Sequence, residues 1–412
     1  MMFASQKNEG DEEAGAPKKG PNMNGLLIFH FGILALIAVG FYLLLTIPAP
    51  IRDEAPTATS SQPAAVASVP IATSTSATTS SSTTQKKDVK VGTTTSTAVK
   101  KANDTATKST PSASTSSQQV ARIENPYSTP PLAFPDINDT ARSAIVNILC
   151  TTSGGSLRPI SGTGVVIDPK GIILTNAHVA QYVLLSQSPQ VNISCSIRTG
   201  NPATARYEPR VIYMPRVWVE EHAKDIKNSR PVGTGEHDYA LIYAAAAVGS
   251  NSLPTSFPYL SPDTREAIGF IGDQALVASY PAEFVGGQAT YNSLYPSTSI
   301  TTVRQLLTFG SHSVDVISLG GVIQAQSGSS GGAAVNAWGR MIGLITTTSE
   351  GATTAERDLR AITLSYIDRD ILTQTGSGLT ATLAGDPSVQ AVNFSKNDGL
   401  ELVKLLIAAI VN

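Results

Sequence analysis

Residues Gly25 to Ile47 form an almost uninterrupted apolar run, which constrains the chain more than any other feature of its sequence. Roughly 20 apolar residues span the hydrocarbon core of a bilayer as a helix. A cleavable signal peptide has a shorter apolar stretch and a small-residue cleavage site, so the run predicts an uncleaved signal anchor. His30 is its one polar intrusion, and it lies near enough to the start of the run for an interfacial position.

Basic residues on either side of this run predict its orientation. Lys18 and Lys19 precede it, whereas Arg52 alone follows closely. Because Lys and Arg are retained on the cytoplasmic side, we expect residues 1–24 to be a disordered cytoplasmic tail. The rest of the chain would lie outside the cytoplasm, in the cell envelope or the extracellular space, and the protein would be a single-pass membrane protein.

Residues 48–126 are predicted to be a disordered linker. Nearly half of the residues between 55 and 120 are Ser or Thr, and none is Phe, Trp or Tyr. Such a composition cannot bury enough apolar surface to offset the conformational entropy lost on ordering. We therefore expect a tether between the membrane and a folded domain that begins near Tyr127.

Short apolar runs bounded by Gly, Pro, Ser or Asp fill the chain after Tyr127. They are Ala144–Leu149, Gly164–Ile167, Gly171–Leu174, Ala240–Tyr243, Gln274–Ser279, Val314–Leu319 and Gly343–Thr347. Many short strands with turn residues between them predict an all-β domain. Residues 398–411 instead have helical periodicity and predict a terminal helix docked on the body. Its apolar face would consist of Leu402, Leu405, Leu406, Ala409 and Ile410.

The composition excludes several partners and fold classes. A formal net charge of −2 gives no sign of a nucleic-acid partner, which usually requires a basic surface. Two cysteines are too few for a disulfide-dense scaffold or a multi-cysteine zinc domain. We predict no metal and no organic cofactor.

The segment Gly328-Ser329-Ser330-Gly331-Gly332 is the most informative for chemistry. All five histidines precede Ser330, whereas the nucleophile elbow of an α/β-hydrolase needs its His after the Ser. The subtilisin order of Asp, His and Ser belongs to a fold with alternating helices, which the β-rich pattern lacks. The order His, Asp, Ser remains, and His178 and Asp238 each adjoin a strand-like run.

Through these residues the sequence resembles the chymotrypsin-fold serine proteases, and more closely their bacterial HtrA-like, or trypsin-like peptidase, branch. Three patterns between Asp136 and about Leu372 carry the resemblance: Ser161 to His178, Asp238-Tyr239-Ala240-Leu241, and Gly328 to Gly332. The resemblance implies two six-stranded antiparallel β-barrels with substrate in the cleft between them. The barrels would occupy residues 127–255 and 256–376, followed by a C-terminal extension with a helix at 377–412.

The resemblance also implies the chemistry. His178 would take the proton of Ser330 and later give it to the leaving amine, while Asp238 would orient the imidazole. The amides of Gly328 and Ser330 would form the oxyanion hole. The chain would then be a membrane-anchored serine endopeptidase acting on polypeptides. An inactive protease-like domain that binds peptides or envelope partners is the alternative, and esterase activity at the same site is also compatible with the sequence.

Three positions, Ser329, Gln324 and Thr348, suggest how the chain departs from its relatives. Ser329 stands where proteases activated by cleavage carry an Asp, so zymogen activation of that type is not expected. The resemblance places Gln324 near the base of the primary specificity pocket, and Thr346, Thr347 and Thr348 on the strand that pairs with substrate. Because Gln324 is uncharged and Thr348 replaces a common Gly, we expect a preference for small or medium uncharged side chains.

Two features of the sequence each have two possible interpretations. Cys150 and Cys195 are compatible with a disulfide outside the cytoplasm and equally with two buried free thiols. The long segment between Cys195 and Asp238, which contains Trp218, either covers the cleft or decorates the barrel.

The remaining histidines and the chain's end complete the expectations. His222, His237 and His312 match no motif, and we expect them at the surface or in loops. About 40 residues follow Leu372, which is too few for the PDZ domain that many HtrA-like enzymes carry. The sequence does not indicate an oligomeric state.

Overall fold

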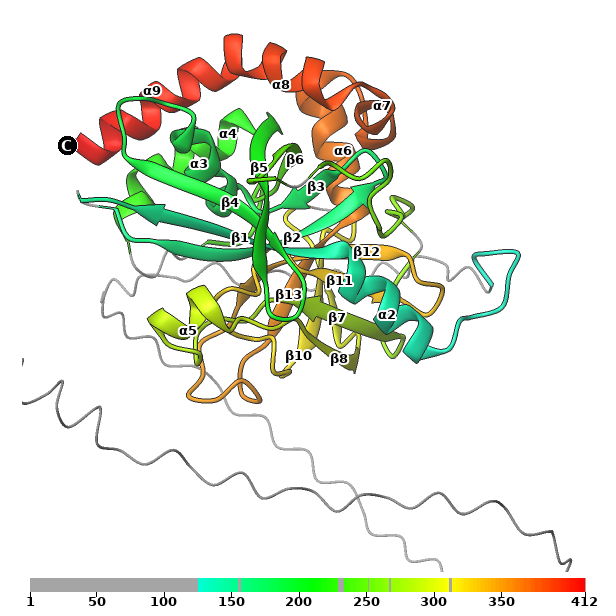
Figure 1. The fold of residues 1–412 in the computed structure, drawn as a ribbon. Helices are drawn as coiled ribbons and strands as arrows, with labels where there is room; N and C mark the ends of the chain where they lie inside the picture. Colours follow the sequence, from blue (N-terminus) through cyan, green and yellow to red (C-terminus); the bar gives the residue numbers. More distant parts are fainter. Residues whose placement is uncertain are drawn as a thin grey trace, which may run out of the picture. The chain divides into compact units, whose positions relative to one another are not determined.

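The computed structural model describes residues 125–411 except 155–156, 229–232, 251, 267 and 311–312 (Figure 1). The tail predicted at 1–24, the membrane anchor at 25–47 and nearly all of the linker at 48–126 lie outside the described residues, as does His312. Within the described part of the chain, no helix combines the length and the apolar character that crossing a membrane requires.

The first sheet is a closed antiparallel barrel of six strands in the order β1-β2-β3-β6-β5-β4. The strands are β1 (Ile145–Thr152), β2 (Ile160–Asp168), β3 (Ile172–Thr175), β4 (Ile193–Thr199), β5 (Thr204–Tyr213) and β6 (Ala240–Ala247). The barrel closes because β1 pairs with β2 along one edge and with β4 along the other. The prediction of a first six-stranded barrel is confirmed.

Alternate residues of the barrel strands enter two different cores, which explains why the strands are apolar along both faces. Ile172 and Leu174 of β3 pack in a core shared with the second sheet, to which Leu276 contributes. Ile173, between them, packs in a core that includes Val183 and Leu402 from helices outside the barrel. The first barrel is therefore buried on the side of the second sheet and also beneath helices.

The second sheet has seven strands in the order β8-β7-β11-β12-β13-β10-β9. They are β7 (Gln274–Ser279), β8 (Ser297–Thr302), β9 (Gln305–Leu307), β10 (Val316–Gly320), β11 (Ala333–Asn336), β12 (Met341–Thr348) and β13 (Leu359–Thr363). The prediction of a closed, six-stranded second barrel is wrong. Among the described residues, the edge strands β8 and β9 do not pair with each other, so the sheet is open.

One interrupted strand accounts for the difference between six and seven. Only Val303 and Arg304 separate β8 from β9, and β8 pairs with β7 while β9 pairs with β10. Across the interruption, the Arg304 amide donates to the Ser318 carbonyl at 2.7 Å and the Thr301 hydroxyl donates to Leu319 at 2.8 Å. The chain itself therefore connects the two edges of the sheet.

Helices cover the sheets and end the chain (Figure 1). They are α2 (Phe134–Ala144), α3 (Ala177–Ser186), α4 (Arg216–His222), the 3₁₀-helix η1 (Ala223–Lys227), α5 (Gly287–Asn292), α6 (Leu364–Thr375), α7 (Leu379–Ala384), α8 (Pro387–Lys396) and α9 (Asp398–Val411). The predicted terminal helix is confirmed as α9, while α6, α7 and α8 precede it and were not expected from the sequence.

Helix α9 docks on α3, α4 and η1 at one end of the first barrel. Leu402 and Leu406 are fully buried there, whereas Leu405 is 37% exposed. Leu405 was predicted on the docked face, and this is corrected. At 100° per residue, Leu405 lies on the far side of Leu402 from Leu406, outside the buried stripe.

The described part of the segment between Cys195 and Asp238 contains most of β4 together with β5, α4 and η1. Trp218 of α4 is buried in the same core as Leu402 of α9. These elements thus decorate the helical end of the first barrel.

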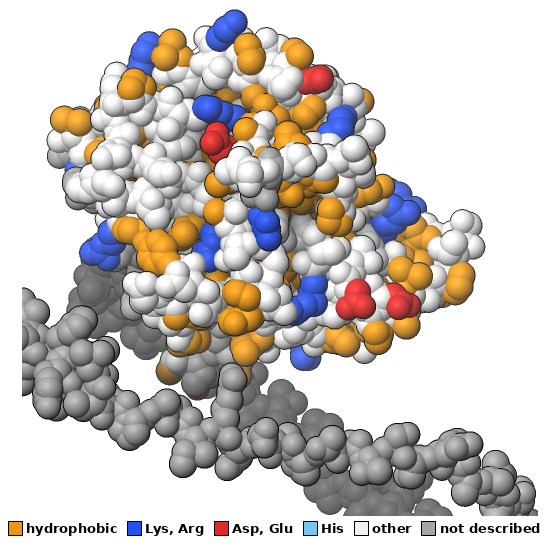
Figure 2. Space-filling model, viewed as in Figure 1, with side chains coloured by type: hydrophobic (Ala, Val, Ile, Leu, Met, Phe, Trp, Pro, Cys, Tyr) orange, Lys and Arg blue, Asp and Glu red, His pale blue; other side chains and the backbone are white. Residues whose placement is uncertain are grey.

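On the face seen in Figure 2, Lys and Arg side chains are scattered among uncharged ones and form no broad basic area.

Candidate active site

His178 lies in the first turn of α3, immediately after β3. Asn176 links the two elements in an extended conformation, and its side-chain amide donates to the Asp238 carbonyl at 2.7 Å. Both Asn176 and the preceding strand are fully buried. The base of the predicted triad is therefore placed by a rigid strand-to-helix junction that is bonded directly to Asp238.

The Asp238 carboxylate accepts three hydrogen bonds. One oxygen, Oδ2, accepts from His178 Nδ1 at 2.7 Å and from the Thr346 hydroxyl at 2.9 Å. The other, Oδ1, accepts from the backbone amide of His178 at 3.0 Å. This geometry sets the imidazole tautomer. Nδ1 carries the proton and donates a hydrogen bond to Asp238, so Nε2 is left as the basic nitrogen.

The pKa values of this pair move apart. Burial by itself would raise the pKa of Asp238, but the charge of His178, its two hydrogen bonds and the Thr346 bond outweigh burial and hold this pKa below its usual range. Burial would lower the pKa of His178, but the charge and hydrogen bond of Asp238 outweigh it and raise that pKa. Asp238 therefore stays ionised while His178 becomes a stronger base.

Ser330 belongs to a loop of the second sheet that is bonded to the first barrel through Thr163 of β2. The Thr163 amide donates to the Ser330 carbonyl at 2.8 Å, and its hydroxyl donates to the Gly328 carbonyl at 2.7 Å. The Thr163 carbonyl in turn accepts from the Thr175 hydroxyl, three residues before His178, at 2.7 Å. Through Thr163, the structure brings the Ser330 loop to the end of β3, directly before the helix α3 that carries His178.

Two glycines in this loop have no possible substitute. Gly328 has φ +91°, and a Cβ there would lie 2.8 Å from the Tyr280 carbonyl oxygen and the Ala282 amide nitrogen. Gly331 has φ +87°, and a Cβ there would lie 1.9 Å from the Thr163 carbonyl oxygen. Both positions therefore require the left-handed backbone and the missing side chain that only glycine provides.

The loop leaves two amides open. In the described part of the chain, the N–H groups of Gly328 and Ser330 donate to no protein acceptor. The neighbouring amides are occupied: Ser329 donates to Gln326 at 3.2 Å, and Gly331 donates to Ile345 at 2.8 Å. The two open amides are the pair that the sequence predicts for an oxyanion hole.

The side chain of Ser330 is half-buried beside these amides. Among the described residues, neither its hydroxyl nor Nε2 of His178 makes a hydrogen bond with the protein. Such contacts in proteins without substrate often tighten only when substrate is bound. Both atoms of the predicted triad are thus without a protein partner in the described part of the chain.

An ion pair fastens the loop before Ser330. Arg357 makes a two-pronged pair with Glu283, at 2.8 and 3.1 Å, and also donates to the Ala325 carbonyl at 2.9 Å. Glu283 accepts from the Ser327 amide at 3.1 Å. The pair therefore joins three segments: the loop after β7, the loop that carries Ser330 and the segment before β13.

Ser329 and Gln324 both turn into the protein. Ser329 is 1% exposed, and its hydroxyl accepts from that of Ser279 at 3.0 Å. Gln324 is fully buried; its amide donates to the Ser297 hydroxyl at 3.0 Å, while Oε1 has no partner among the described residues. The side chain of Gln324 is therefore uncharged and lies inside the second sheet.

Of the three threonines predicted on the strand that pairs with substrate, Thr346 has a further role that sequence reasoning missed. Its side chain is buried and its hydroxyl donates to the Asp238 carboxylate, while the pairing of its backbone with substrate stays a prediction. Thr348 is exposed, and the side chain of Thr347 lies outside the described part. Beyond Ile345, which bonds Gly331 and Gly332, β12 pairs only with β13 and so has one open edge.

The two cysteines and His222 lie apart from the residues around Ser330. Cys150 and Cys195 face each other on β1 and β4 and form a disulfide. His222 ends α4 beside Asp225, at 3.3 Å, and Trp218.

His237 lies in a loop, as predicted. The sequence did not predict its partner: the side chain is 21% exposed and its Nδ1 is 2.8 Å from Asp370 on α6. The prediction missed this because Asp370 is distant in the sequence.

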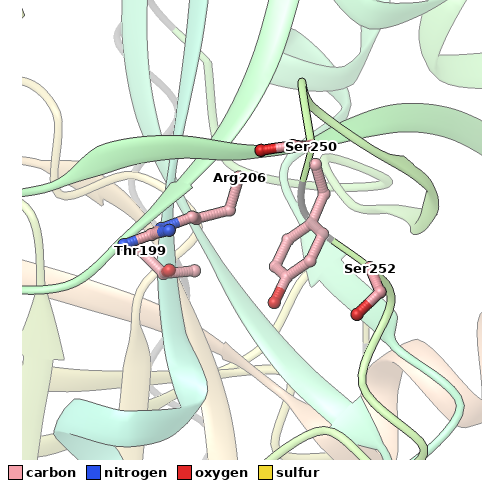
Figure 3. Close-up of a pocket in the computed structure, with 5 residues that line it drawn as sticks. Thr199, Arg206, Ser250 and Ser252 are labelled. Carbon is pink, nitrogen blue, oxygen red and sulfur yellow. The ribbon is translucent and has the colours of Figure 1, made fainter.

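A pocket of about 520 Å³ lies elsewhere, on the first barrel (Figure 3). It is lined by Thr199, Arg206, Tyr207, Ser250 and Ser252. None of these residues belongs to the group around Ser330, so this pocket has no part in its chemistry. Among the described residues, no group of three or more His, Cys, Asp or Glu side chains could hold a metal ion.

Comparison with known proteins finds a matching family model and a similar solved structure. Residues 162–344 match the family model of the trypsin-like peptidase domain. This segment begins within β2, ends within β12 and contains His178, Asp238 and Ser330. The chain is also similar to the crystal structure of Deg5, with 16% sequence identity over 58% of this chain and 93% of that one and a TM-score of 0.38. No curated protein matches the sequence significantly.

Proposed function

We propose that this chain, which carries a trypsin-like peptidase domain of the chymotrypsin-fold serine proteases, is a membrane-anchored endopeptidase that uses His178, Asp238 and Ser330. The observation that carries the proposal is the 2.7 Å bond between His178 Nδ1 and Asp238. It leaves His178 Nε2 as a base directed away from Asp238. The bonds of Thr163 to the Ser330 loop support Ser330 as the nucleophile that this base serves.

The proposed reaction proceeds in two halves. The Ser330 hydroxyl oxygen attacks the substrate carbonyl carbon as its proton passes to His178 Nε2, and Asp238 stabilises the imidazolium. The amides of Gly328 and Ser330 bind the oxygen on which negative charge develops. His178 then protonates the departing amine, which leaves an ester on Ser330. Water, deprotonated by His178, hydrolyses that ester and restores the free hydroxyl.

We further propose that substrate adds to the open edge of β12 beyond Ile345 and places its side chain toward Gln324. Gln324 is neutral and buried, so its side chain offers no negative charge that would select Arg or Lys. Thr348, exposed on the same strand, occupies space where a glycine would leave more room. Small or medium uncharged side chains should therefore dominate a peptide-library cleavage profile, and dominance of Arg or Lys would refute this specificity.

The location is proposed from sequence features and one covalent bond. Gly25 to Ile47 would anchor the chain, with the peptidase domain outside the cytoplasm. The Cys150–Cys195 disulfide supports this side, because such bonds persist in oxidising compartments. In spheroplasts, which lack the outer envelope layers but keep the cytoplasmic membrane, added protease should digest the domain. Digestion only after the cytoplasmic membrane is lysed would place the domain inside.

Labelling with a fluorophosphonate tests the activity itself. The wild-type chain should be labelled and Ser330→Ala should not, because the probe reacts only with an activated serine. Ser395→Ala, which removes an exposed serine of α8 far along the chain, is the matched control and should label as the wild type does. Equal labelling of wild type and Ser330→Ala would contradict the proposal, and peptide binding without any labelling would favour the inactive alternative. If the wild-type protein reacts with the probe, cleavage of casein by unlabelled protein distinguishes a peptidase from an esterase.

A further inference from the structure

A second carboxylate holds both sequence neighbours of Asp238. The Nδ1 atom of His237 and the hydroxyl of Tyr239 each lie 2.8 Å from Oδ2 of Asp370. The intervening Asp238 turns the other way, toward His178. One oxygen on α6 thus anchors the residue before Asp238 and the residue after it.

The turn at this point has an unusual backbone. His237 has φ +56°, a left-handed conformation that residues other than glycine rarely adopt. Its amide donates to the Tyr366 hydroxyl at 3.1 Å, and its carbonyl accepts from Tyr239 at 2.9 Å. A strained residue persists only where surrounding contacts enforce it, and here those contacts come from Asp370 and Tyr366 of the same helix.

Asp370 is well suited to act as the anchor. Its side chain is 9% exposed, and the same Oδ2 atom accepts a further hydrogen bond from Gln374 at 2.7 Å. Bonds from His237, Tyr239 and Gln374 outweigh burial and keep the pKa of Asp370 below its ordinary value. The carboxylate is therefore ionised and fixed by three donors.

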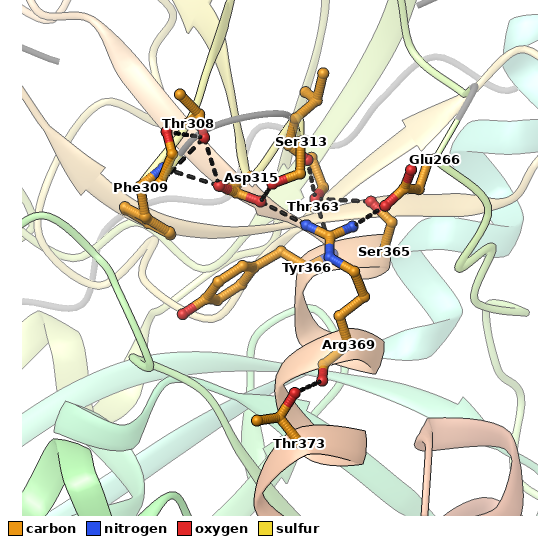
Figure 4. Close-up of polar contacts among 12 residues, drawn as sticks. Glu266, Thr308, Phe309, Ser313, Asp315, Thr363, Ser365, Tyr366, Arg369 and Thr373 are labelled. Atoms are coloured by element: carbon orange, nitrogen blue, oxygen red, sulfur yellow. Dashed lines mark hydrogen bonds and ion pairs between the residues drawn. The ribbon is translucent and has the colours of Figure 1, made fainter. Parts of the chain in front are cut away.

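Helix α6 is itself fixed to the second sheet (Figure 4). The Thr363 hydroxyl caps its first turn by accepting from the Tyr366 amide at 3.1 Å. Arg369, one residue before Asp370, pairs with the buried Asp315 and with Glu266. The turn that presents Asp238 in the first barrel is thus anchored to a helix that continues from β13 of the second sheet.

We propose that His237 and Asp370 are positioning residues for the reaction, which fix the turn before β6 so that the Asp238 carboxylate stays on His178 Nδ1. This inference rests on the proposed function. Neither residue touches the reacting atoms; each acts through the backbone on either side of Asp238.

Titration of His178 tests the inference without relying on activity. The full chain is labelled with ¹⁵N at histidine only, and the pKa of His178 is measured by NMR. Asp370→Ala and His237→Gly should each lower that pKa, because a displaced Asp238 raises it less. Glycine adopts the left-handed backbone without strain, so His237→Gly removes the anchor alone. In both variants kcat should fall about 10- to 100-fold with little change in KM.

Conservative variants and a control make the test specific. Asp370→Asn keeps an acceptor oxygen and His237→Asn keeps a donor that tolerates positive φ, so both should retain more activity than the corresponding Ala and Gly variants. Thr373→Ala, which removes an exposed side-chain hydrogen bond to the Arg369 carbonyl within α6, should leave the His178 pKa and kcat unchanged. His237 titrates beside Asp370, Tyr366 and Glu236, with Glu221 farther off, and its own resonance is followed separately.

The outcomes decide between the claims. An unchanged His178 pKa in folded His237→Gly overturns the positioning role, as does a loss of activity that merely follows the unfolded fraction. If Asp370→Ala does not fold, the His178 pKa in His237→Gly and in Asp370→Asn still tests the positioning role. If the wild type fails to react with fluorophosphonate, the proposed function fails, while the His178 titration continues to show whether the pair holds Asp238.

Discussion

The first barrel and the second sheet hold their parts of the candidate site by different means. His178 and Asp238 of the first barrel are held by hydrogen bonds between side chains, to which Thr346 adds one from β12 of the second sheet. In the sheet, the Ser330 loop is held by its backbone, through the bonds of Thr163 and the tight space around Gly331. The first half should therefore be sensitive to charge and donor changes, and the second to any added side-chain atom.

The largest effect is expected from Asp238→Asn in the first half. The amide can still accept one bond, but it no longer stabilises the imidazolium, and its NH₂ group favours the wrong His178 tautomer. By analogy with the same change in other serine triads, kcat should fall about 10⁴-fold. Steady-state kinetics on a peptide substrate measures this, with a near-UV circular dichroism spectrum to establish that the variant is folded. A loss below about tenfold would mean that Asp238 is not the triad acid.

A backbone change should come next, in the second half. Gly331→Ala places a Cβ 1.9 Å from the Thr163 carbonyl, so the loop must move and the amides of Gly328 and Ser330 lose their alignment. Loss of one oxyanion donor lowers kcat by about 10²- to 10³-fold. Gly287→Ala is the matched control, because a Cβ there meets nothing within 4 Å, and it should retain full kcat. Equal kcat in the two variants would show that the loop is not held by its backbone.

The pH dependence separates the halves in a third way. His178 must be neutral to act as a base, and its pKa is raised above the ordinary value of about 6.5. We expect kcat/KM to be maximal above that raised pKa and to fall about tenfold per pH unit below it. The stability contributed by the charged His178–Asp238 pair runs in the opposite direction: it is present below pH about 6.5 and is lost as pH rises through the folded pKa. An acidic limb centred below 6.5 would contradict the raised value.

The smallest effect on catalysis should come from the disulfide. Cys150→Ser with Cys195→Ser breaks a bond between β1 and β4, and neither strand carries a residue of the triad. In the chain-entropy model, the free energy of unfolding should fall by about 4 kcal/mol while kcat of the folded fraction changes little. Urea denaturation and steady-state kinetics on the same sample measure the two quantities. A large fall in kcat at full folding would link the bond to the site.

Local patterns predicted the strands because burial and turn formation leave local traces. All seven apolar runs named from the sequence overlap strands, from β1 to β12, since Val- and Ile-rich runs ended by turn residues fit a buried sheet. Of the helices after β13, α9 was predicted from the sequence, but α6, α7 and α8 were missed, although α8 begins with an Asp386 cap followed by Pro387. Short polar helices have little periodicity, so their capping residues were the available signal.

The order of His178, Asp238 and Ser330, and the glycines around the serine, were set by the sequence alone. Chain order excludes competing hydrolase folds, and a loop that leaves no room for a Cβ must carry glycine wherever it lies. The disulfide stayed undecided at that level, because bonded and free cysteines both occur in strands.

Tertiary structure alone decided which distant side chains support the site. Thr346 meets Asp238 across 108 residues, and His237 meets Asp370 across 133. Periodicity reports which face of an element is buried, but a pair between separate elements depends on the path of the chain between them. Only the fold therefore shows that the turn carrying Asp238 is held by α6, and that one broken strand makes seven segments where six were expected.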